Sequence, residues 1–228
     1  MNWSTLFLLL LFVLLSCSQP KMNYCIEGYA SNVADGETIT LARSPDGISL
    51  EILSQSVVKD GRFCLKGYVE NCRIGYICCN APQKNSCTMF FMEKGDLEAV
   101  IDSLGCRITG TSVNELASAV EDSINHYVLG METIEELCCS TLPDSARLAQ
   151  LGIEGLYRQE MLVDYLKRTV NENIGNLLGL YMLVVYSELF TDNELLLLKE
   201  MIPPSSIDRD DNPLYDVLTE ILQVRQSK

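Results

Sequence analysis

The sequence predicts an α+β protein, in which an N-terminal antiparallel β-sandwich or open barrel is followed by a helical segment packed on it. Apolar and polar residues alternate with a period close to two over residues 24–110. Helical spacing replaces that alternation over residues 111–228, and no repeat or long Gly/Ser linker separates the two halves. We therefore expect an antiparallel β-domain over 24–110 and an acidic helical segment over 111–228, packed as one unit.

Turn signals divide the N-terminal half into short strands. The turns lie at Asp35-Gly36, Pro45-Asp46-Gly47, Asp60-Gly61 and Lys94-Gly95-Asp96. Between them the alternation predicts strands over 38–41, 62–66, 73–77 and 88–92, among roughly eight strands in all. We expect 62–69 to pair with 73–80, and 73–80 to pair in turn with 87–92.

Capping residues and apolar spacing locate the helices. Thr111 or Ser112 is expected to cap a helix that runs through Ile124, with Glu115 as the return half of a capping box. The same signals predict a short helix over 131–139, a long one from Asp144, a buried one over 176–189, one after a Thr191–Glu194 capping box, and a last one over 213–224.

The net charge of −14 lies almost wholly in the helical half. Residues 17–110 hold nine Lys or Arg and eleven Asp or Glu, whereas residues 111–228 hold eight and twenty. Electrostatic capture of nucleic acid needs clustered positive charge, so we expect no nucleic-acid partner. We interpret the acidity as a solvated helix surface.

The first sixteen residues have the pattern of a lipoprotein signal peptide. Leu6 to Leu15 is an apolar run that is too short to span a membrane and suits a signal peptide. It ends in Leu14-Leu15-Ser16-Cys17, which resembles a bacterial lipobox, although no Lys or Arg precedes the run. We expect lipid, including palmitate, on Cys17, a tether over 17–23, and anchoring at the periplasmic face of the outer membrane. The alternatives are an ordinary signal peptide or a buried N-terminal helix.

Motifs for catalysis and metal binding are missing from the sequence. His126 is the only histidine, and no Ser or Cys signature lies near it. There is no C-x-x-C pair, and the acidic stretch 208–212 lacks the glycine and closing glutamate of a calcium loop. We expect no metal, no cofactor and no enzymatic activity; a hydrolase would need His126 beside a nucleophile in a cleft.

Nine cysteines remain once Cys17 is set apart, an odd number that cannot all pair within one chain. In a strand, Cys78 and Cys79 face opposite sides, so each would need a different partner. The expected strand pairing places Cys64 opposite Cys78 and brings Cys79 near Cys87, at separations that a disulfide spans. The alternative is that these cysteines are free thiols that pack as small apolar residues.

Several short motifs occur in an order that resembles a known family. They are Glu27-Gly28, Asp35-Gly36 with Ile39 and Leu41, 58–63 with Lys66-Gly67, 91–96, 109–114 and 173–179. Together they are similar to the domain of unknown function that precedes the thioredoxin-like (TlpA/AhpC-type) domain in lipoproteins of Gram-negative anaerobes. The resemblance implies a lipoprotein, this fold and this compartment. It assigns no redox activity to any residue, because the chain contains no C-x-x-C.

Three tripeptides are similar to the O-glycosylation signal of the same lineage, in which Asp precedes Ser or Thr and an apolar residue. Their acceptors would be Ser103, Ser123 and Ser145.

The function we expect is that of a membrane-anchored periplasmic lipoprotein domain that binds a partner or ligand. The alternative is an accessory protein in periplasmic thiol–disulfide redox pathways. It would use its own cysteines or dock a thioredoxin-like or other envelope protein.

Overall fold

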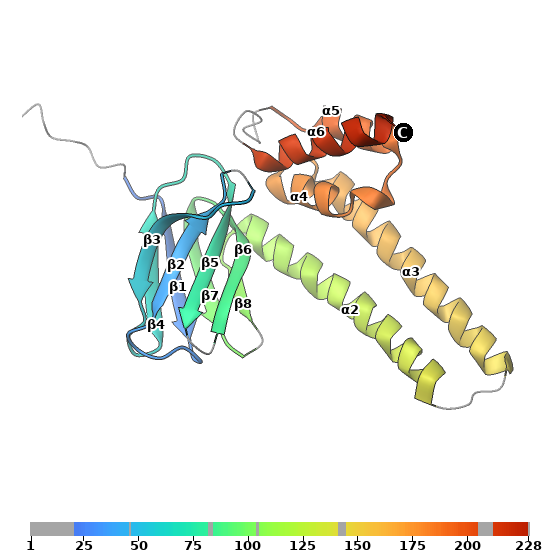
Figure 1. Ribbon diagram of the computed structural model, residues 1–228, viewed down its shortest axis with the longest axis horizontal. Coiled ribbons are helices and arrows are strands. Elements are labelled where there is room, and N and C mark those ends of the chain that lie inside the picture. The colour runs from blue at the N-terminus through green and yellow to red at the C-terminus, as the bar shows by residue number, and fades with distance from the viewer. Residues whose placement is uncertain are drawn as a thin grey trace, which may run out of the picture.

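The computed structural model describes residues 21–45, 47–81, 84–103, 105–140, 145–204 and 212–227. In this part of the chain two four-stranded sheets are followed by helices, which confirms the α+β class (Figure 1). The strands form two separate sheets that are not closed into a barrel, so the sandwich is the one of the two expected architectures that is present.

The first sheet has the strand order β4-β1-β7-β8, and the second has the order β3-β2-β5-β6. The strands of the first sheet are Arg62–Gly67 (β4), Tyr24–Ala30 (β1), Gly95–Ile101 (β7) and Cys106–Thr109 (β8). Those of the second are Glu51–Val57 (β3), Thr38–Arg43 (β2), Arg73–Ala81 (β5) and Lys84–Met92 (β6). The pairing of β1 with β7 is parallel, unlike the expected antiparallel order. A parallel pair needs a long crossover, and the strands of the second sheet lie within it.

The expected pairing of 62–69 with 73–80 is wrong. Strand β4 pairs with β1 in the first sheet, whereas β5 lies between β2 and β6 in the second. The chain therefore changes sheets after β4 instead of closing a hairpin there. The pairing of β5 with β6 is confirmed.

The space between the sheets is filled by alternate side chains of both. The largest fully buried ones include Ile26, Ile39, Leu41, Leu65, Ile77 and Ile101. Each contributes about 1.5–3 kcal/mol by leaving water. This core explains the period of two that marks the N-terminal half of the sequence.

The helices are Ser112–Ser140 (α2), Ser145–Asn173 (α3), Leu177–Val185 (α4), the 3₁₀ turn Ser187–Leu189 (η1), Asp192–Met201 (α5) and Pro213–Gln226 (α6). Helices α2 and α3 form a long hairpin that projects from the sandwich, and α4, α5 and α6 lie at its base (Figure 1). None of the described helices is both long and apolar enough to cross a membrane.

One helix replaces the two that were expected between residues 111 and 139. Gly130 lies within α2 and does not end it, because a glycine inside a helix costs only about 1 kcal/mol. The Thr191 capping box is confirmed: Thr191 Oγ1 accepts from the Glu194 N–H at 3.3 Å, and Glu194 Oε2 accepts from the Thr191 N–H at 2.7 Å. Glu115, which was expected to complete a capping box at Thr111 or Ser112, accepts a hydrogen bond from the Gly110 N–H at 2.9 Å.

A second core joins the helices to the second sheet. Phe91 of β6 is buried in it, and Ile74, directly opposite in β5, packs against it from the same face. The helical residues of this core include Val120, Leu166, Val170, Leu178, Leu183, Leu195 and Leu218. The helical segment thus packs on the sandwich against strands β5 and β6.

Candidate functional site

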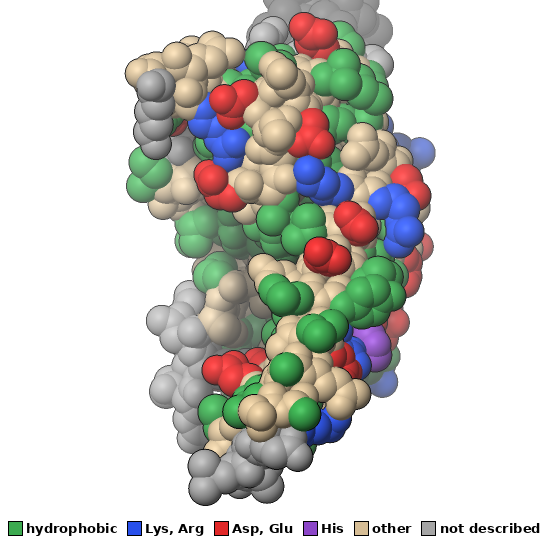
Figure 2. Space-filling view, turned by 90° about the vertical axis from the view of Figure 1, so that its right-hand side faces the viewer, with side chains coloured by type: hydrophobic (Ala, Val, Ile, Leu, Met, Phe, Trp, Pro, Cys, Tyr) green, Lys and Arg blue, Asp and Glu red, His purple; other side chains and the backbone are tan. Residues whose placement is uncertain are grey.

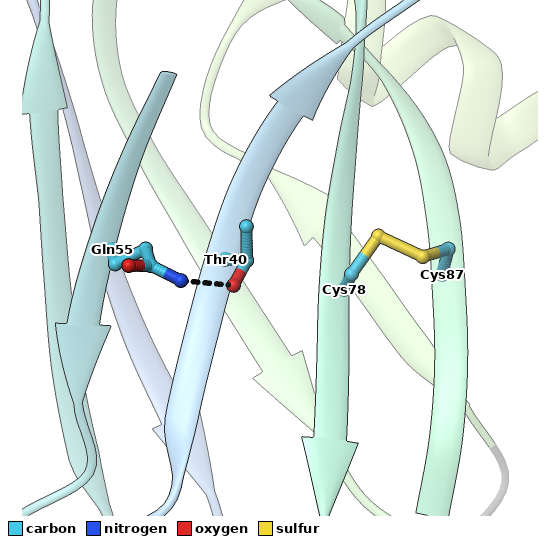
Figure 3. Close-up of a disulfide and its surroundings, with 4 residues drawn as sticks. All are labelled: Thr40, Gln55, Cys78 and Cys87. Atoms are coloured by element: carbon cyan, nitrogen blue, oxygen red, sulfur yellow. Dashed lines mark hydrogen bonds between the residues drawn. A yellow bond between two sulfur atoms is a disulfide. The ribbon is translucent and has the colours of Figure 1, made fainter. Parts of the chain in front are cut away.

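Four cysteines form two cross-strand pairs, one on each sheet. On the second sheet a disulfide joins Cys78 of β5 to Cys87 of β6 (Figure 3). The two residues are directly opposite each other in the strand register. The same row continues across β2 and β3 with Thr40 and Gln55, whose Nε2 donates to Thr40 Oγ1 at 3.1 Å (Figure 3).

The structure corrects both expected cysteine pairs. Cys64 does not oppose Cys78, because β4 and β5 belong to different sheets. Cys79 does not bond to Cys87, because the register of β5 and β6 places Ser86 opposite Cys79. Cys79 instead faces the inter-sheet core, where it is buried as a free thiol. A shift of one residue in a strand turns every side chain to the other face.

The pair on the first sheet is not bonded. Cys25 Sγ of β1 lies 3.8 Å from Cys64 Sγ of β4. Cys25 opposes Lys66 and Cys64 opposes Glu27, so the two cysteines are diagonal neighbours. Cys64 is exposed and Cys25 is half-buried. Burial, followed by the contact with the Cys64 thiol, raises the pKa of Cys25 above its usual value.

A shallow pocket of about 400 Å³ lies beside Cys64. Its lining includes Tyr29 of β1, with the Arg62 guanidinium 5.0 Å from the centre of the Tyr29 ring. Ser56 of β3 closes another side, and its Oγ accepts from the Cys64 N–H at 3.1 Å. The Cys64 thiol therefore stands at the rim of a space with both aromatic and charged walls.

The remaining described cysteines differ in exposure. Cys72 is half-buried, and burial together with the nearby Glu93 carboxylate raises the pKa of its thiol to about 12. Cys106 and Cys138 are half-buried, and Cys139 is exposed. Among the residues that the structure describes, no three His, Cys, Asp or Glu side chains are grouped as a metal site requires.

His126 is exposed on α2, where its ring lies edge-on to that of Tyr127. It lines a pocket of about 360 Å³ between α2 and α3, together with Thr133. The Thr133 hydroxyl donates to the Leu129 carbonyl at 2.8 Å, so this hydroxyl is engaged within its own helix.

The three proposed glycosylation serines lie in different settings. Ser103 is exposed after β7, and Ser145 is exposed at the first position of α3. Ser123 is half-buried in α2, and its hydroxyl donates to the Ala119 carbonyl at 2.8 Å. The signal peptide, Cys17 and the acidic stretch 208–211 lie outside the described residues.

An apolar surface on the α2–α3 hairpin was not predicted. We call it the hairpin surface; its exposed members are Leu129, Leu137, Leu148, Ile153, Leu156, Tyr157 and Met161. Ile153 is 70% and Leu156 is 65% exposed. Hydrophobic side chains interrupt the charged surface on this side of the molecule (Figure 2). The signal was present in the sequence, because the apolar residues of 145–166 are too many for one buried helix face.

A cavity of about 330 Å³ lies where α2 and α4 meet β6 and β8. Arg107 and Asn114 line it, and both are engaged in hydrogen bonds. The Arg107 guanidinium donates to Ser118 Oγ at 2.8 Å and to Asp122 Oδ2 at 2.6 Å. These contacts join β8 to α2.

Residues 24–117 match the family model described as "Domain of unknown function (DUF4369)". The match covers the described strands and the start of α2, which is less than half of the chain, so this part of the chain is similar to a domain of unknown function. No curated protein matches the chain.

Proposed function

We propose that this protein is a periplasmic lipoprotein, anchored in the outer membrane through Cys17, that binds another envelope protein through its helical hairpin. The observation that carries the proposal is the hairpin surface. Seven large apolar side chains there are exposed on a hairpin that projects from the sandwich (Figure 1). Four of them, Ile153, Leu156, Tyr157 and Met161, follow helical spacing on α3, and an exposed apolar patch of this kind is typical of a protein interaction site.

The geometry of the hairpin suits this role. Each of its two helices has 29 residues, so the hairpin extends about 40 Å. Ile153, Leu156, Tyr157 and Met161 follow helical spacing on α3 and are all exposed, whereas Leu151 and Leu166 of the same helix are buried. The α3 helix therefore has an apolar stripe besides the one that packs in the core.

The proposed anchor keeps the sandwich close to the membrane. The lipobox-like sequence ends at Cys17, and β1 begins at Tyr24. The seven residues 17–23 span at most about 25 Å when extended. Mass spectrometry of the mature N-terminus tests the anchor: we expect acylated Cys17, and the Cys17→Ser variant should leave the membrane fraction. An unmodified Cys17 in membrane-bound protein would remove this part of the proposal.

Site-specific photo-crosslinking in cells tests the partner. A photoreactive residue at Ile153 should capture one defined envelope protein, whereas the same residue at exposed Tyr68 on the sandwich should not. The variant Leu156→Asp should abolish this capture. The matched variant Leu197→Asp, at a 60% exposed leucine of α5, should preserve it. Equal capture from Ile153 and Tyr68, or capture that survives Leu156→Asp, would contradict the role of the hairpin.

A second candidate function is that of an accessory protein in thiol–disulfide exchange, docking a separate thioredoxin-like protein. The observation that favours it is the unbonded pair Cys25–Cys64 on the first sheet. We expect a thioredoxin-like protein that lacks its resolving cysteine to attack Cys64 Sγ of the oxidised Cys25–Cys64 pair, to release the Cys25 thiolate, and to remain trapped as a mixed disulfide with Cys64. Absence of this adduct, with both proteins folded and reactive, would exclude the function.

A further inference from the structure

We infer that Cys25 and Cys64 form a reversible dithiol–disulfide site, which closes by exchange with an external disulfide. The inference deepens the second candidate function, since it names the residues and the reaction. It concerns chemistry that the purified chain should perform with a small disulfide, whether or not a protein partner exists.

The distance between the two thiols is the first support. The sulfur atoms are 3.8 Å apart, in contact but unbonded, and a disulfide brings them to about 2.05 Å. Cys25 and Cys64 both lie on the outer face of the first sheet, where burial alternates along β1 and β4. Closing the gap therefore involves side chains on the outer face of the sheet, which point away from the core between the sheets.

The strand register supports reversibility. Cys78 and Cys87 are directly opposite each other and are bonded, whereas Cys25 and Cys64 are diagonal neighbours. Diagonal positions are farther apart at Cβ than directly opposed ones, so a bond between them stores strain. Strained and exposed disulfides are the more easily reduced ones. We therefore expect the Cys25–Cys64 bond to be more easily reduced than the Cys78–Cys87 bond.

Access to the site is unequal for the two thiols. Cys64 is exposed on β4, an edge strand of its sheet, and stands at the rim of the pocket that Tyr29 and Arg62 line. This pocket offers room for the group that carries an incoming disulfide. Cys25 is half-buried behind it. We therefore assign Cys64 as the attacking thiol and Cys25 as the resolving thiol.

The reaction takes two steps. The Cys64 thiolate attacks one sulfur of an external disulfide, RSSR, forms the Cys64–SR mixed disulfide and releases RS⁻. Cys25 loses its proton to water, and its thiolate attacks Cys64 Sγ, forms the Cys25–Cys64 bond and releases the second RS⁻. In total the two cysteines lose two protons and two electrons, and the external disulfide gains them as two RSH.

Charged groups surround the pair on the same sheet face. Lys66 opposes Cys25 on β4, and Asp96 opposes it on β7. Glu27 opposes Cys64 and is in turn opposite Glu98. The Lys66 ammonium stabilises the Cys25 thiolate electrostatically, whereas the Glu27 carboxylate destabilises it.

The experiment uses the purified full chain with Cys25 and Cys64 reduced, treated with oxidised glutathione as the external disulfide. Peptide mapping should find a Cys25–Cys64 link. In the Cys25→Ser variant the reaction should stop at Cys64 carrying one glutathione, and Cys64→Ser should prevent the link altogether. Cys139→Ser is the matched control, because Cys139 is also exposed and should not affect closure. Thermal unfolding of each variant, and Cys64→Ala as a second replacement, separate lost chemistry from lost structure.

Reversibility has its own measurement. We expect the Cys25–Cys64 bond to open at a concentration of reduced glutathione at least about tenfold lower than the Cys78–Cys87 bond requires. Glutathione on Cys64 and Cys139 alike without a Cys25–Cys64 link, or a link as resistant as Cys78–Cys87, would overturn the inference. Closure with glutathione but no adduct with a thioredoxin-like protein would leave the site established and refute only the second candidate function.

Discussion

The side-chain amide of Asn114 in α2 is hydrogen-bonded to both backbone groups of Phe91 in β6. Its Oδ1 accepts from the Phe91 N–H at 3.0 Å, and its Nδ2 donates to the Phe91 carbonyl at 2.6 Å. Because β6 is an edge strand, these backbone groups have no neighbouring strand to bond to in the described sheet. Asn114 takes the place of such a strand and fixes the helical segment to the sandwich.

We expect Asn114→Ala to lower the free energy of unfolding by about 2–4 kcal/mol, because it leaves two buried backbone groups without partners. Urea unfolding followed by circular dichroism measures the effect. The matched control is Asn171→Ala, since Asn171 is exposed and its Nδ2 donates only to the Lys167 carbonyl in its own helix. Its effect should stay within about 0.5 kcal/mol. Equal losses in the two variants would show that Asn114 does not couple the halves.

The Thr191–Glu194 capping box makes stability depend on pH. The Thr191 backbone N–H, followed by the Lys167 ammonium, lowers the pKa of Glu194. A carboxyl group whose pKa is lower in the folded than in the unfolded protein stabilises the fold at pH values above its unfolded pKa. This stabilisation is lost as the pH falls through the folded pKa. Glu194 is partly exposed, so we expect its ionisation to contribute under about 1 kcal/mol to the free energy of unfolding.

The melting temperatures of the wild type and Glu194→Gln at several pH values test this box. The variant should melt at a lower temperature at pH 7, and the difference should vanish at acid pH, where the wild-type carboxyl is protonated. Glu160→Gln, at an exposed glutamate of α3, provides the baseline. A difference that persists unchanged in acid would contradict the assignment.

Local patterns predicted most elements of this fold and the pairing of β5 with β6, but not the strand beside β4. The alternation over 38–41 and 73–77 and the Thr191 capping box identify structure formed by residues near one another in sequence. Which strand lies beside β4 depends on where the chain crosses between sheets. The spacing of apolar residues is the same in either sheet, so it could not reveal the pairing of β4 with β1.

The cysteine pairs show the same limit more sharply. The sequence placed Cys79 near Cys87, whereas the register of β5 and β6 places Cys78 opposite Cys87, one residue away from the expected partner. The Cys25–Cys64 contact joins residues 39 positions apart across a strand pairing that was not predicted. The hairpin surface was missed for a different reason: the apolar residues of 145–166 are too many for one buried helix face, but their spacing does not tell which of them are exposed.

Cys72 and Cys64 should differ strongly in reactivity. Burial, with a contribution from Glu93, raises the pKa of Cys72 to about 12, whereas Cys64 is exposed. Alkylation requires the thiolate, so iodoacetamide at pH 8 should modify Cys64 long before Cys72 in the folded protein. Peptide mass spectrometry at timed intervals measures both rates. In urea the difference should disappear, and rapid native modification of Cys72 would contradict its burial.

Gly110 lies between β8 and α2 and has a φ of +99°. A Cβ atom there would lie 2.6 Å from the carbonyl oxygen of Asp96, so Gly110→Ala combines backbone strain with a steric clash. We expect a loss of about 2–4 kcal/mol in urea unfolding. Gly36→Ala is the matched control, because Gly36 has a φ of +93° and no atom within 4 Å of its Cβ position. It should lose only about 1 kcal/mol from strain. Since the two glycines share nearly the same φ, the excess loss in Gly110→Ala measures the contact with Asp96, and equal losses would show that the backbone moves to relieve it.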